Sequence, residues 1–324
     1  MSQDRKKQVR EFTCNIRAER SFAFLGFFMY IIENFNEMKK TLVYHIYLQD
    51  DIDTNLGYKI NAECLKYYID VFDKVKFVMV MDDMSNVALR NKGIEFANSI
   101  GFNKETDIYF RQNTELGECA TVRDFVVNYE KDCDEYVFFG HTKGITYFGD
   151  KTPNVSKQSM FIWMLVSYFY NLNFIKEVND VFTGKGFPVK AFYGALLMRF
   201  QKKSEDEKLI PLMIPKFHYS GSFYWVNKPY LFKIANKINL DKVTFNYRYD
   251  TEFLPGYLFD PYGGEGLWTH NNIFFNLKGM IGAFYSLPYK GWEVFIEAMG
   301  NAEEFKEFCE EIGNKVGFKI DKNM

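Results

Sequence analysis

The sequence predicts an α/β protein with a mostly parallel, doubly wound sheet in its first half and a mixed α+β arrangement in its second. Between residues 41 and 140, four segments rich in β-branched and aromatic residues alternate with segments whose apolar side chains recur at helical spacing. Strand–helix repeats of this kind form parallel sheets with right-handed crossovers. After residue 150 the alternation stops, and short strand-like and helix-like segments follow. We therefore expect a Rossmann-like half followed by a mixed half.

The first strand–helix unit shows the pattern most clearly. Residues 41–49 (TLVYHIYLQ) are β-branched and aromatic and run into Asp50 and Asp51, which is typical of a buried strand that ends in a polar loop. Residues 60–73 then carry apolar side chains at the spacing of a helix face. The further predicted strands are residues 76–81, 107–112 and 135–140, and the further predicted helices are residues 86–99, closed by Gly101, and residues 121–129.

The second half is predicted to pack with the first as one continuous unit. No low-complexity linker or internal repeat separates residues 1–150 from residues 151–324. The elements expected in the second half are a helix at 155–172, a turn at Gly184 and Gly186, a strand at 191–200, a surface loop at 203–208, a strand at 216–227 bent at Gly221, a helix at 229–238, a loop at 261–270 and a helix at 302–316.

The composition is that of an ordinary globular protein with one unusual feature. Apolar residues make up 47% of the chain and charged residues 25%, which argues against wholesale disorder. Aromatic residues reach 19%, a value that codon bias in an A/T-rich genome produces and that also suits stacking against sugar rings or bases. The formal net charge of −2 provides no general basic field for nucleic acid or anionic lipid.

Cysteine usage and hydropathy favour a cytoplasmic protein. The five cysteines form no CxxC pair, and their odd number argues against a disulfide framework or a cysteine-built zinc site. The chain opens with charged residues, and no uninterrupted apolar stretch approaches the roughly 20 residues that span a bilayer. We therefore expect no transmembrane segment, and the sequence does not indicate an oligomeric state.

Polar residues gather at the ends of the four predicted strands. In doubly wound sheets, ligands bind outside the carboxyl ends of the strands, so these loops are the expected site. A solvated rim is the alternative interpretation. The candidate residues are Asp51 after the first strand, Asp82 and Asp83 after the second, Arg111 at the end of the third, and His141 with Lys143 after the fourth.

The segment that ends the fourth strand, His141-Thr142-Lys143-Gly144, has the residue types that bind a phosphate group. Lys143 supplies a permanent cation and His141 a titratable one. Thr142 and the glycine offer a hydroxyl and backbone N–H donors. Taken alone, the segment is more typical of a strand exit with a turn glycine, so its surroundings decide the interpretation.

Those surroundings resemble a bacterial and viral family of glycosyltransferases linked to surface-polysaccharide synthesis, for which a GT-A-like fold is expected. In that family a Gly-Glu…Thr-Leu helix precedes the strand and its His-Thr-Lys-Gly motif. A Trp-containing helix, a Tyr-Ser-Gly-Asn-Phe-Trp-Trp-like segment and an Arg…Glu-Trp pattern follow the motif. The matching residues stand here in the same order: Gly117-Glu118 with Thr121, His141 to Gly144, Trp163, His218-Tyr219-Ser220-Gly221-Ser222-Phe223-Tyr224-Trp225, and Arg248 with Glu252.

The resemblance covers about residues 107–255, and it has departures that bear on the acceptor pocket. Val122 stands where the family has Leu, and Ser222 replaces Asn. Tyr224 and Phe253 each stand where the family has Trp. We therefore expect an acceptor pocket that differs from that of the polysaccharide enzymes.

The resemblance implies transfer of a sugar from a nucleotide-sugar donor, such as a UDP-sugar, to an acceptor hydroxyl of a glycan or surface polysaccharide. His141 and Lys143 would stabilise the departing diphosphate, and Glu252 would take the acceptor proton. Phe223 and Trp225 share one face of the predicted strand, where they either floor a sugar site or belong to the core. The expected donor-binding residues are Asp51, Asp82, Asp83, Arg111, Thr142, Gly144 and Arg248, and the expected acceptor-binding residues are Ser220, Gly221, Phe223 and Trp225.

The sequence leaves the metal and the acceptor open. Most GT-A enzymes hold a metal with an Asp-x-Asp at the end of a mid-domain strand, where this chain has His141-Thr142-Lys143; Asp51-Ile52-Asp53 has the letters but follows the first strand. Metal dependence is therefore not favoured, and Mn²⁺ or Mg²⁺ held by a carboxylate with His141, His218 or His270 is the alternative. The acceptor could instead be a hydroxymethylated base of phage DNA, which the near-neutral charge disfavours. An inert carbohydrate-binding or scaffold protein is the remaining alternative.

Overall fold

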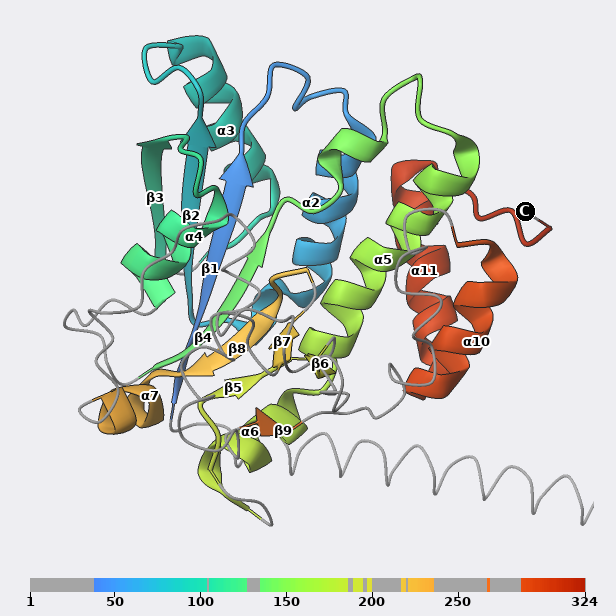
Figure 1. Ribbon diagram of the computed structural model, residues 1–324. Coiled ribbons are helices and arrows are strands. Elements are labelled where there is room, and N and C mark those ends of the chain that lie inside the picture. The colour runs from blue at the N-terminus through green and yellow to red at the C-terminus, as the bar shows by residue number, and fades with distance from the viewer. Residues whose placement is uncertain are drawn as a thin grey trace, which may run out of the picture. The chain divides into compact units, whose positions relative to one another are not determined.

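The main sheet joins strands from both halves of the chain. The structure is a computed structural model, and it describes residues 38–103, 105–126, 135–185, 189–194, 197–199, 217–219, 221–235, 267–268 and 287–323. Residues Met1–Met38 and Lys39–Met324 form two separate units, and the described elements belong to the second. Within the described residues, seven strands form the sheet in the order β3-β2-β1-β4-β8-β5-β9 (Figure 1).

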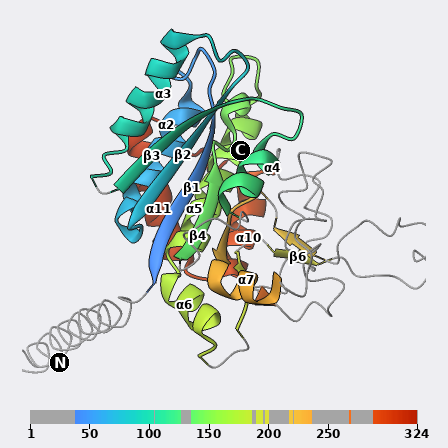
Figure 2. The ribbon, with the colours of Figure 1, turned by 90° about the vertical axis from the view of Figure 1, so that its left-hand side faces the viewer.

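The first four strands are parallel, as the sequence predicts. β1 (Lys39–Tyr47) lies between β2 (Lys74–Met81) and β4 (Glu135–His141), and β3 (Glu105–Gln112) pairs with β2. Figure 2 shows these strands side by side. The α/β class with a mostly parallel sheet is therefore confirmed.

The strands of the second half make the sheet mixed. β8 (Tyr224–Asn227) pairs antiparallel with both β4 and β5 (Phe192–Tyr193), and β5 pairs parallel with β9 (Leu267–Trp268). A separate two-stranded sheet joins β6 (Leu197–Arg199) to β7 (Phe217–Tyr219).

Two strand predictions are wrong in the same way. Residues 216–227 are not one bent strand, because β7 and β8 lie in different sheets, and residues 191–200 are likewise divided between β5 and β6. Gly221 and Ser222 both have positive φ, at 86° and 57°. Two consecutive residues in the left-handed region cannot continue a strand, so the predicted bend is a break.

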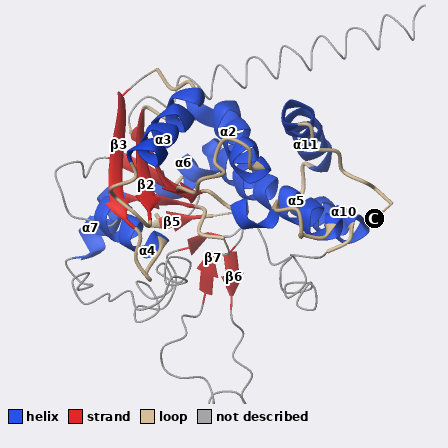
Figure 3. Ribbon diagram, turned by 90° about the horizontal axis from the view of Figure 1, so that it is seen from above, coloured by secondary structure: helices blue, strands red, loops and turns tan. Residues whose placement is uncertain are grey.

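Helices cover both faces of the sheet. The side chains of β1 point alternately to the two faces and are buried on both, so each face needs a covering layer. Val43 belongs to an apolar cluster with Val122 and Leu231, whereas Tyr44 points the opposite way, toward Asn61. In Figure 3, α2 (Leu56–Tyr68), α5 (Asn154–Leu172), α10 (Tyr289–Met299) and α11 (Ala302–Val316) lie on one side of the sheet, and α4 (Glu118–Thr121) and α7 (Lys228–Ala235) on the other.

Helix positions are largely as predicted, with local differences. α2 begins before the predicted residue 60, because the Asn55 side chain accepts from Gly57 N at 2.8 Å and caps the helix. The predicted helix 121–129 is α4 followed by a π-helical turn, η2 (Val122–Val126). α3 (Val87–Ser99), α5, α7 and α11 match their predictions closely, and a short 3₁₀ turn, η1 (Ile69–Val71), follows α2.

Two helices of the second half are not predicted. They are α10 and α6 (Ile175–Thr183), and α6 ends at Gly184, which adopts the left-handed conformation as expected for the predicted turn. None of the helices that the structure describes combines the length and the apolar character needed to cross a bilayer.

Candidate functional site

A cleft of about 630 Å³ lies at the carboxyl edge of the parallel strands. Its walls come from the end of β1, the segment between β3 and α4, and the loop that follows β4. In Figure 1 this edge lies beyond the arrowhead of β1. The lining side chains that matter below are His45, Tyr47, Asn113, Glu118, His141 and Lys143. The position of the cleft agrees with the general placement of ligand sites in such sheets.

His141 ends β4 and is fixed at both ring nitrogens. Its Nε2 lies 2.9 Å from the Gly221 carbonyl oxygen and its Nδ1 lies 3.3 Å from Glu118 Oε1. A carbonyl oxygen only accepts hydrogen bonds, so Nε2 carries the proton and donates it. Protonation of Nδ1 would add a charged contact to the Glu118 carboxylate. His141 thus links the β4 loop to two segments that are remote in sequence.

Lys143 lies where three pieces of the predicted motif meet. Its Nζ is 5.4 Å from the centre of the Trp163 ring on α5, within the range of a cation–π contact. A Cβ on Gly221 would lie 3.1 Å from this Nζ and 3.4 Å from Trp163 Nε1. Gly221 therefore leaves the space that the ammonium group and the indole occupy.

Thr142 and Gly144 shape the backbone of the same loop. Thr142 is buried; its N–H donates to His45 O at 2.9 Å, and its Oγ1 accepts from Tyr47 N at 3.2 Å. This hydroxyl therefore extends the β1–β4 pairing beyond the strand end. Gly144 has φ of 74°, and a Cβ there would lie 2.6 Å from Met160 Cγ. Both its conformation and its surroundings require glycine.

Asp82 is joined to the cleft through two lining residues. It accepts from Tyr47 Oη at 2.5 Å and from Asn113 Nδ2 at 2.8 Å. The hydrogen bond from Tyr47 lowers the pKa of Asp82, and the same bond raises the pKa of Tyr47 to about 12. Asp82 is therefore an ionised group that orients Tyr47 at the cleft wall.

The other expected donor-binding residues make local contacts. Asp83 accepts from Ser85 N at 2.8 Å and from Ser85 Oγ at 2.6 Å. Asp51 accepts from Asn55 Nδ2 at 2.8 Å, next to the start of α2. Arg111 pairs with Asp124 at 3.0 Å. None of Asp51, Asp83 and Arg111 is among the residues that line the cleft.

Both carboxylates of the Asp-x-Asp sequence contact other side chains in the described structure. Asp53 lies 2.6 Å from Lys92 Nζ, and Asp51 is engaged with Asn55. Among the residues whose placement is described, no three His, Cys, Asp or Glu side chains are grouped closely enough to hold a metal ion. His270 and the side chain of His218 lie outside the described residues.

The floor of the cleft contains a histidine that the sequence analysis missed. His45 is buried, and its Nδ1 lies 2.8 Å from Thr121 Oγ1 on α4. Burial lowers the pKa of His45 to about 4, against an opposing effect of Glu118, so the ring is neutral at pH 7. The sequence pattern could have indicated His45, because the period of two along β1 places it on the same strand face as Val43 and Tyr47, where a polar ring is unusual.

The two aromatic residues expected at the acceptor site are buried. Trp225 is 1% exposed; its Nε1 donates to Asn171 O at 2.9 Å and its ring packs 5.1 Å from Phe138. Phe223 is also 1% exposed and packs against Tyr168. Trp225 lies on β8, an internal strand of the sheet, and Phe223 directly precedes that strand, so both rings belong to the core. Ser220, Arg248 and Glu252 lie outside the described residues.

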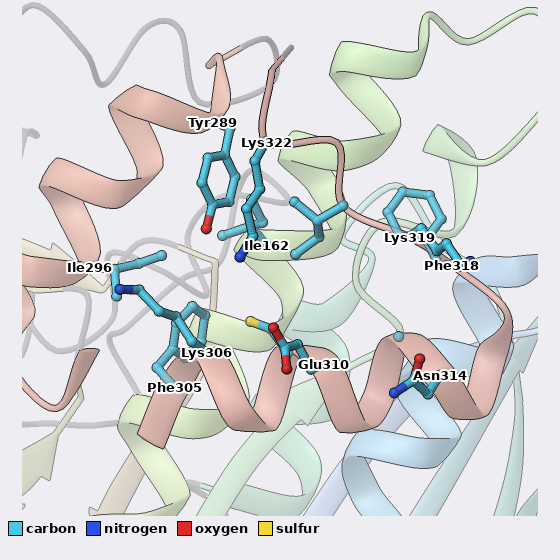
Figure 4. Close-up of a pocket in the computed structure, with 13 residues that line it drawn as sticks. Ile162, Tyr289, Ile296, Phe305, Lys306, Glu310, Asn314, Phe318, Lys319 and Lys322 are labelled. Atoms are coloured by element: carbon cyan, nitrogen blue, oxygen red, sulfur yellow. The ribbon is translucent and has the colours of Figure 1, made fainter. Parts of the chain in front are cut away.

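A second cavity, of about 240 Å³, lies between α5, α10, α11 and the segment after α11 (Figure 4). It shares no lining residue with the strand-edge cleft, and much of its wall is aliphatic or aromatic. Burial raises the pKa of the Cys309 thiol in its wall, so this cysteine is not a reactive thiolate. The strand-edge cleft is the candidate site, because it lies at the carboxyl ends of the parallel strands and is lined by the His141–Gly144 segment.

Comparisons with known proteins assign no family. No protein-family model and no curated protein matches the chain. Among solved structures, residues 1–349 of S. aureus TarS match with a TM-score of 0.31 and 9% sequence identity, over 86% of this chain and 71% of that one. A similarity of this size establishes neither a shared fold nor a shared activity, and the functional interpretation rests on the cleft and on the sequence motifs.

Proposed function

We propose that the protein is a glycosyltransferase that binds a nucleotide-sugar donor in the strand-edge cleft and transfers the sugar to an acceptor hydroxyl of a glycan or surface polysaccharide. The observation that carries the proposal is the position of Lys143. This residue of the His-Thr-Lys-Gly motif lines a cleft of about 630 Å³ and meets Trp163 and Gly221, which belong to other parts of the same motif set. In this proposal the sheet is the donor-binding part of a GT-A-like fold.

The chemistry needs a cation where the leaving group develops charge. The acceptor oxygen forms a bond to the anomeric carbon of the sugar, and the bond from that carbon to the diphosphate oxygen breaks. The diphosphate leaves with an additional negative charge, which a fixed ammonium group stabilises. Lys143 supplies that charge, and His141, whose Nδ1 lies beside Glu118, is a titratable group in the same cleft.

A carboxylate takes the acceptor proton in an inverting reaction, and the leaving phosphate does so in a retaining one. Glu252 stays the proposed base on the strength of the resemblance. The donor is a UDP-sugar or a similar nucleotide sugar, and a divalent ion on the diphosphate is the less favoured alternative. Thr142 and Gly144 line the cleft directly, and Asp82 is the best placed of the proposed donor-binding carboxylates, because its partner Tyr47 lines the cleft.

The test is a panel of nucleotide sugars screened by thermal stability and by release of nucleoside diphosphate. A ligand that is present at 100 times its Kd adds about 2.7 kcal/mol to the unfolding free energy, so a true donor raises the melting temperature visibly. We expect Lys143→Ala to reduce the rate of diphosphate release about 100-fold or more.

Lys157→Ala is the matched control, because Lys157 is a partly exposed lysine on α5 that does not line the cleft. It should keep the wild-type rate. A wild-type protein that neither binds nor cleaves any nucleotide sugar in the panel would contradict the proposal and leave a binding or scaffold function.

A further inference from the structure

Three buried polar side chains meet directly behind the loop that carries Lys143. Tyr44 comes from β1, Asn61 from α2 and Tyr168 from α5, and all three are fully buried. The two tyrosine hydroxyls lie 2.5 Å apart, and Asn61 Oδ1 lies 2.9 Å from Tyr44 Oη and 2.7 Å from Tyr168 Oη. Burial raises the pKa of both tyrosines, so both hydroxyls keep their protons.

This trio reaches the backbone of the motif loop at two points. Asn61 Nδ2 donates to Lys143 O at 2.9 Å and to Gly57 O at 2.7 Å, which uses both of its hydrogens. Tyr44 Oη lies 2.9 Å from His141 O. The carbonyl groups of the residues on either side of Thr142 are therefore held by side chains in the interior, none of which lines the cleft.

The start of α2 holds the next part of the loop in the same manner. Asn55 Nδ2 donates to Ile145 O at 2.9 Å. A Cβ on Gly57 would lie 2.7 Å from Ile145 Cα, so the glycine allows the helix and the loop to touch. Three alternate carbonyl groups, at 141, 143 and 145, thus bond to side chains of β1 and α2.

We propose that Tyr44, Asn61 and Tyr168 are positioning residues that fix the loop His141–Gly144 so that Lys143 stays aimed at the leaving group. The proposal rests on the donor site proposed above. Tyr44 and Asn61 bond to the loop backbone, and Tyr168 bonds to both of them. None of the three lines the cleft, so they act through Lys143 and not by contact with the donor. A displacement of a catalytic group by about 1 Å can cost 100-fold in rate, which makes a rigid support of this kind valuable.

Two matched pairs of variants separate positioning from simple core stability. Asn61→Ser is compared with Asn171→Ser: both asparagines are fully buried, and each donates to the carbonyl four residues earlier at 2.7 Å. Tyr168→Phe is compared with Tyr170→Phe, because Tyr170 lies on the same helix and donates to Gly300 O at 2.8 Å, away from the loop. Tyr168→Phe removes one oxygen atom only, and it carries the test if Asn61→Ser does not fold.

Two measurements are made on each variant. The first is hydrogen exchange of the peptide that covers residues 141–147, relative to the global stability. The second is steady-state release of nucleoside diphosphate from the donor that the wild type cleaves. We expect Asn61→Ser and Tyr168→Phe to speed the exchange of this peptide and to lower kcat about 10- to 100-fold, with a smaller change in KM. The two control variants should change neither quantity.

Equal kcat values and equal exchange for the test and control variants would overturn the positioning role. Failure of the proposed function has a different signature, because the wild type then releases no diphosphate from any donor. The exchange experiment still decides in that case whether the trio holds the loop.

Discussion

At the scale of single residues, the cleft depends on places where a side chain would not fit. Gly57 lets α2 touch the loop after β4, and Gly221 leaves room for the ammonium group of Lys143. Gly144 combines a φ of 74° with close contact to Met160. Glycine at these positions therefore has steric reasons that are independent of turn propensity.

Gly144→Ala is expected to cost more stability than its conformation alone explains. Gly101 is the matched control, because its φ of 75° is nearly the same and no atom lies within 4 Å of a Cβ built there. Gly101→Ala should lower the unfolding free energy by about 1–2 kcal/mol, the cost of the left-handed conformation for an L-residue. Gly144→Ala should cost about 1–3 kcal/mol more, because the methyl group displaces Met160. Urea unfolding of both variants measures the difference, and equal losses would show that Met160 adapts freely.

Residues at the end of a predicted strand are predictable from the sequence pattern, and residues whose role depends on a contact far away in the sequence are not. His141 and Lys143 stand at a strand end, where the period of the pattern identifies them. Asn61 bonds to Lys143 across 82 positions, and nothing in the local sequence of α2 indicates that partner. Trp225 was assigned to the acceptor because burial depends on which strands flank β8, and a single sequence does not contain the pairing order.

At the scale of elements, β8 is the element that joins the two halves. It pairs with β4 along Tyr136 to Phe139, and its own partner β5 also comes from the second half. The strand–helix alternation predicted the parallel strands because each repeat is local. It failed for residues 216–227 because a pair of residues with positive φ moves β7 and β8 into different sheets.

A buried ion pair joins β4 to α7 at the end of β4 that lies away from the cleft. Lys228 Nζ, from α7, lies 2.8 Å from Glu135 Oε1, and the two side chains are 4% and 2% exposed. Thr41 on β1 donates to the other oxygen of the carboxylate. Lys228→Met removes one partner only and should lower the unfolding free energy by about 3–5 kcal/mol, because it leaves a buried charge unpaired. The double variant Lys228→Met/Glu135→Leu should recover most of this loss.

The exposed pair Lys306–Glu303 is the control for that double-mutant cycle. Its side chains are 33% and 83% exposed, so Lys306→Met should change the stability by less than about 1 kcal/mol. Equilibrium urea unfolding of all variants gives the coupling energy. A loss for Lys228→Met no larger than that for Lys306→Met would mean that water reaches Glu135 in solution.

At the scale of the whole molecule, the sheet has a packed layer on each face, and the cleft lies where the carboxyl ends of its strands are left uncovered. One layer contains Val43 and Leu231, and the other contains Tyr44 and Trp225. His45 lies between the core and the cleft: it is buried, yet it lines the cleft floor. The stability of the folded protein should therefore respond to the protonation of this one residue.

Burial lowers the pKa of His45 to about 4, below the unperturbed value of about 6.5 that applies to the unfolded chain. Between these two values the unfolded chain binds a proton that the folded protein does not, so the stability is full above pH 6.5 and falls as the pH falls toward 4. Between pH 7 and pH 5 the loss from this residue should be about 2 kcal/mol. The carboxylates whose pKa is lowered, Asp82, Asp83 and Glu105, stay ionised in this window and do not contribute to the slope.

The variant His45→Asn tests this argument, because asparagine keeps a polar group at the Nδ1 position facing Thr121 but cannot titrate. The loss of about 2 kcal/mol between pH 7 and pH 5 should therefore be absent from this variant. Urea unfolding of both proteins at pH 7, 6 and 5 measures the two slopes, and equal slopes would place His45 in contact with water.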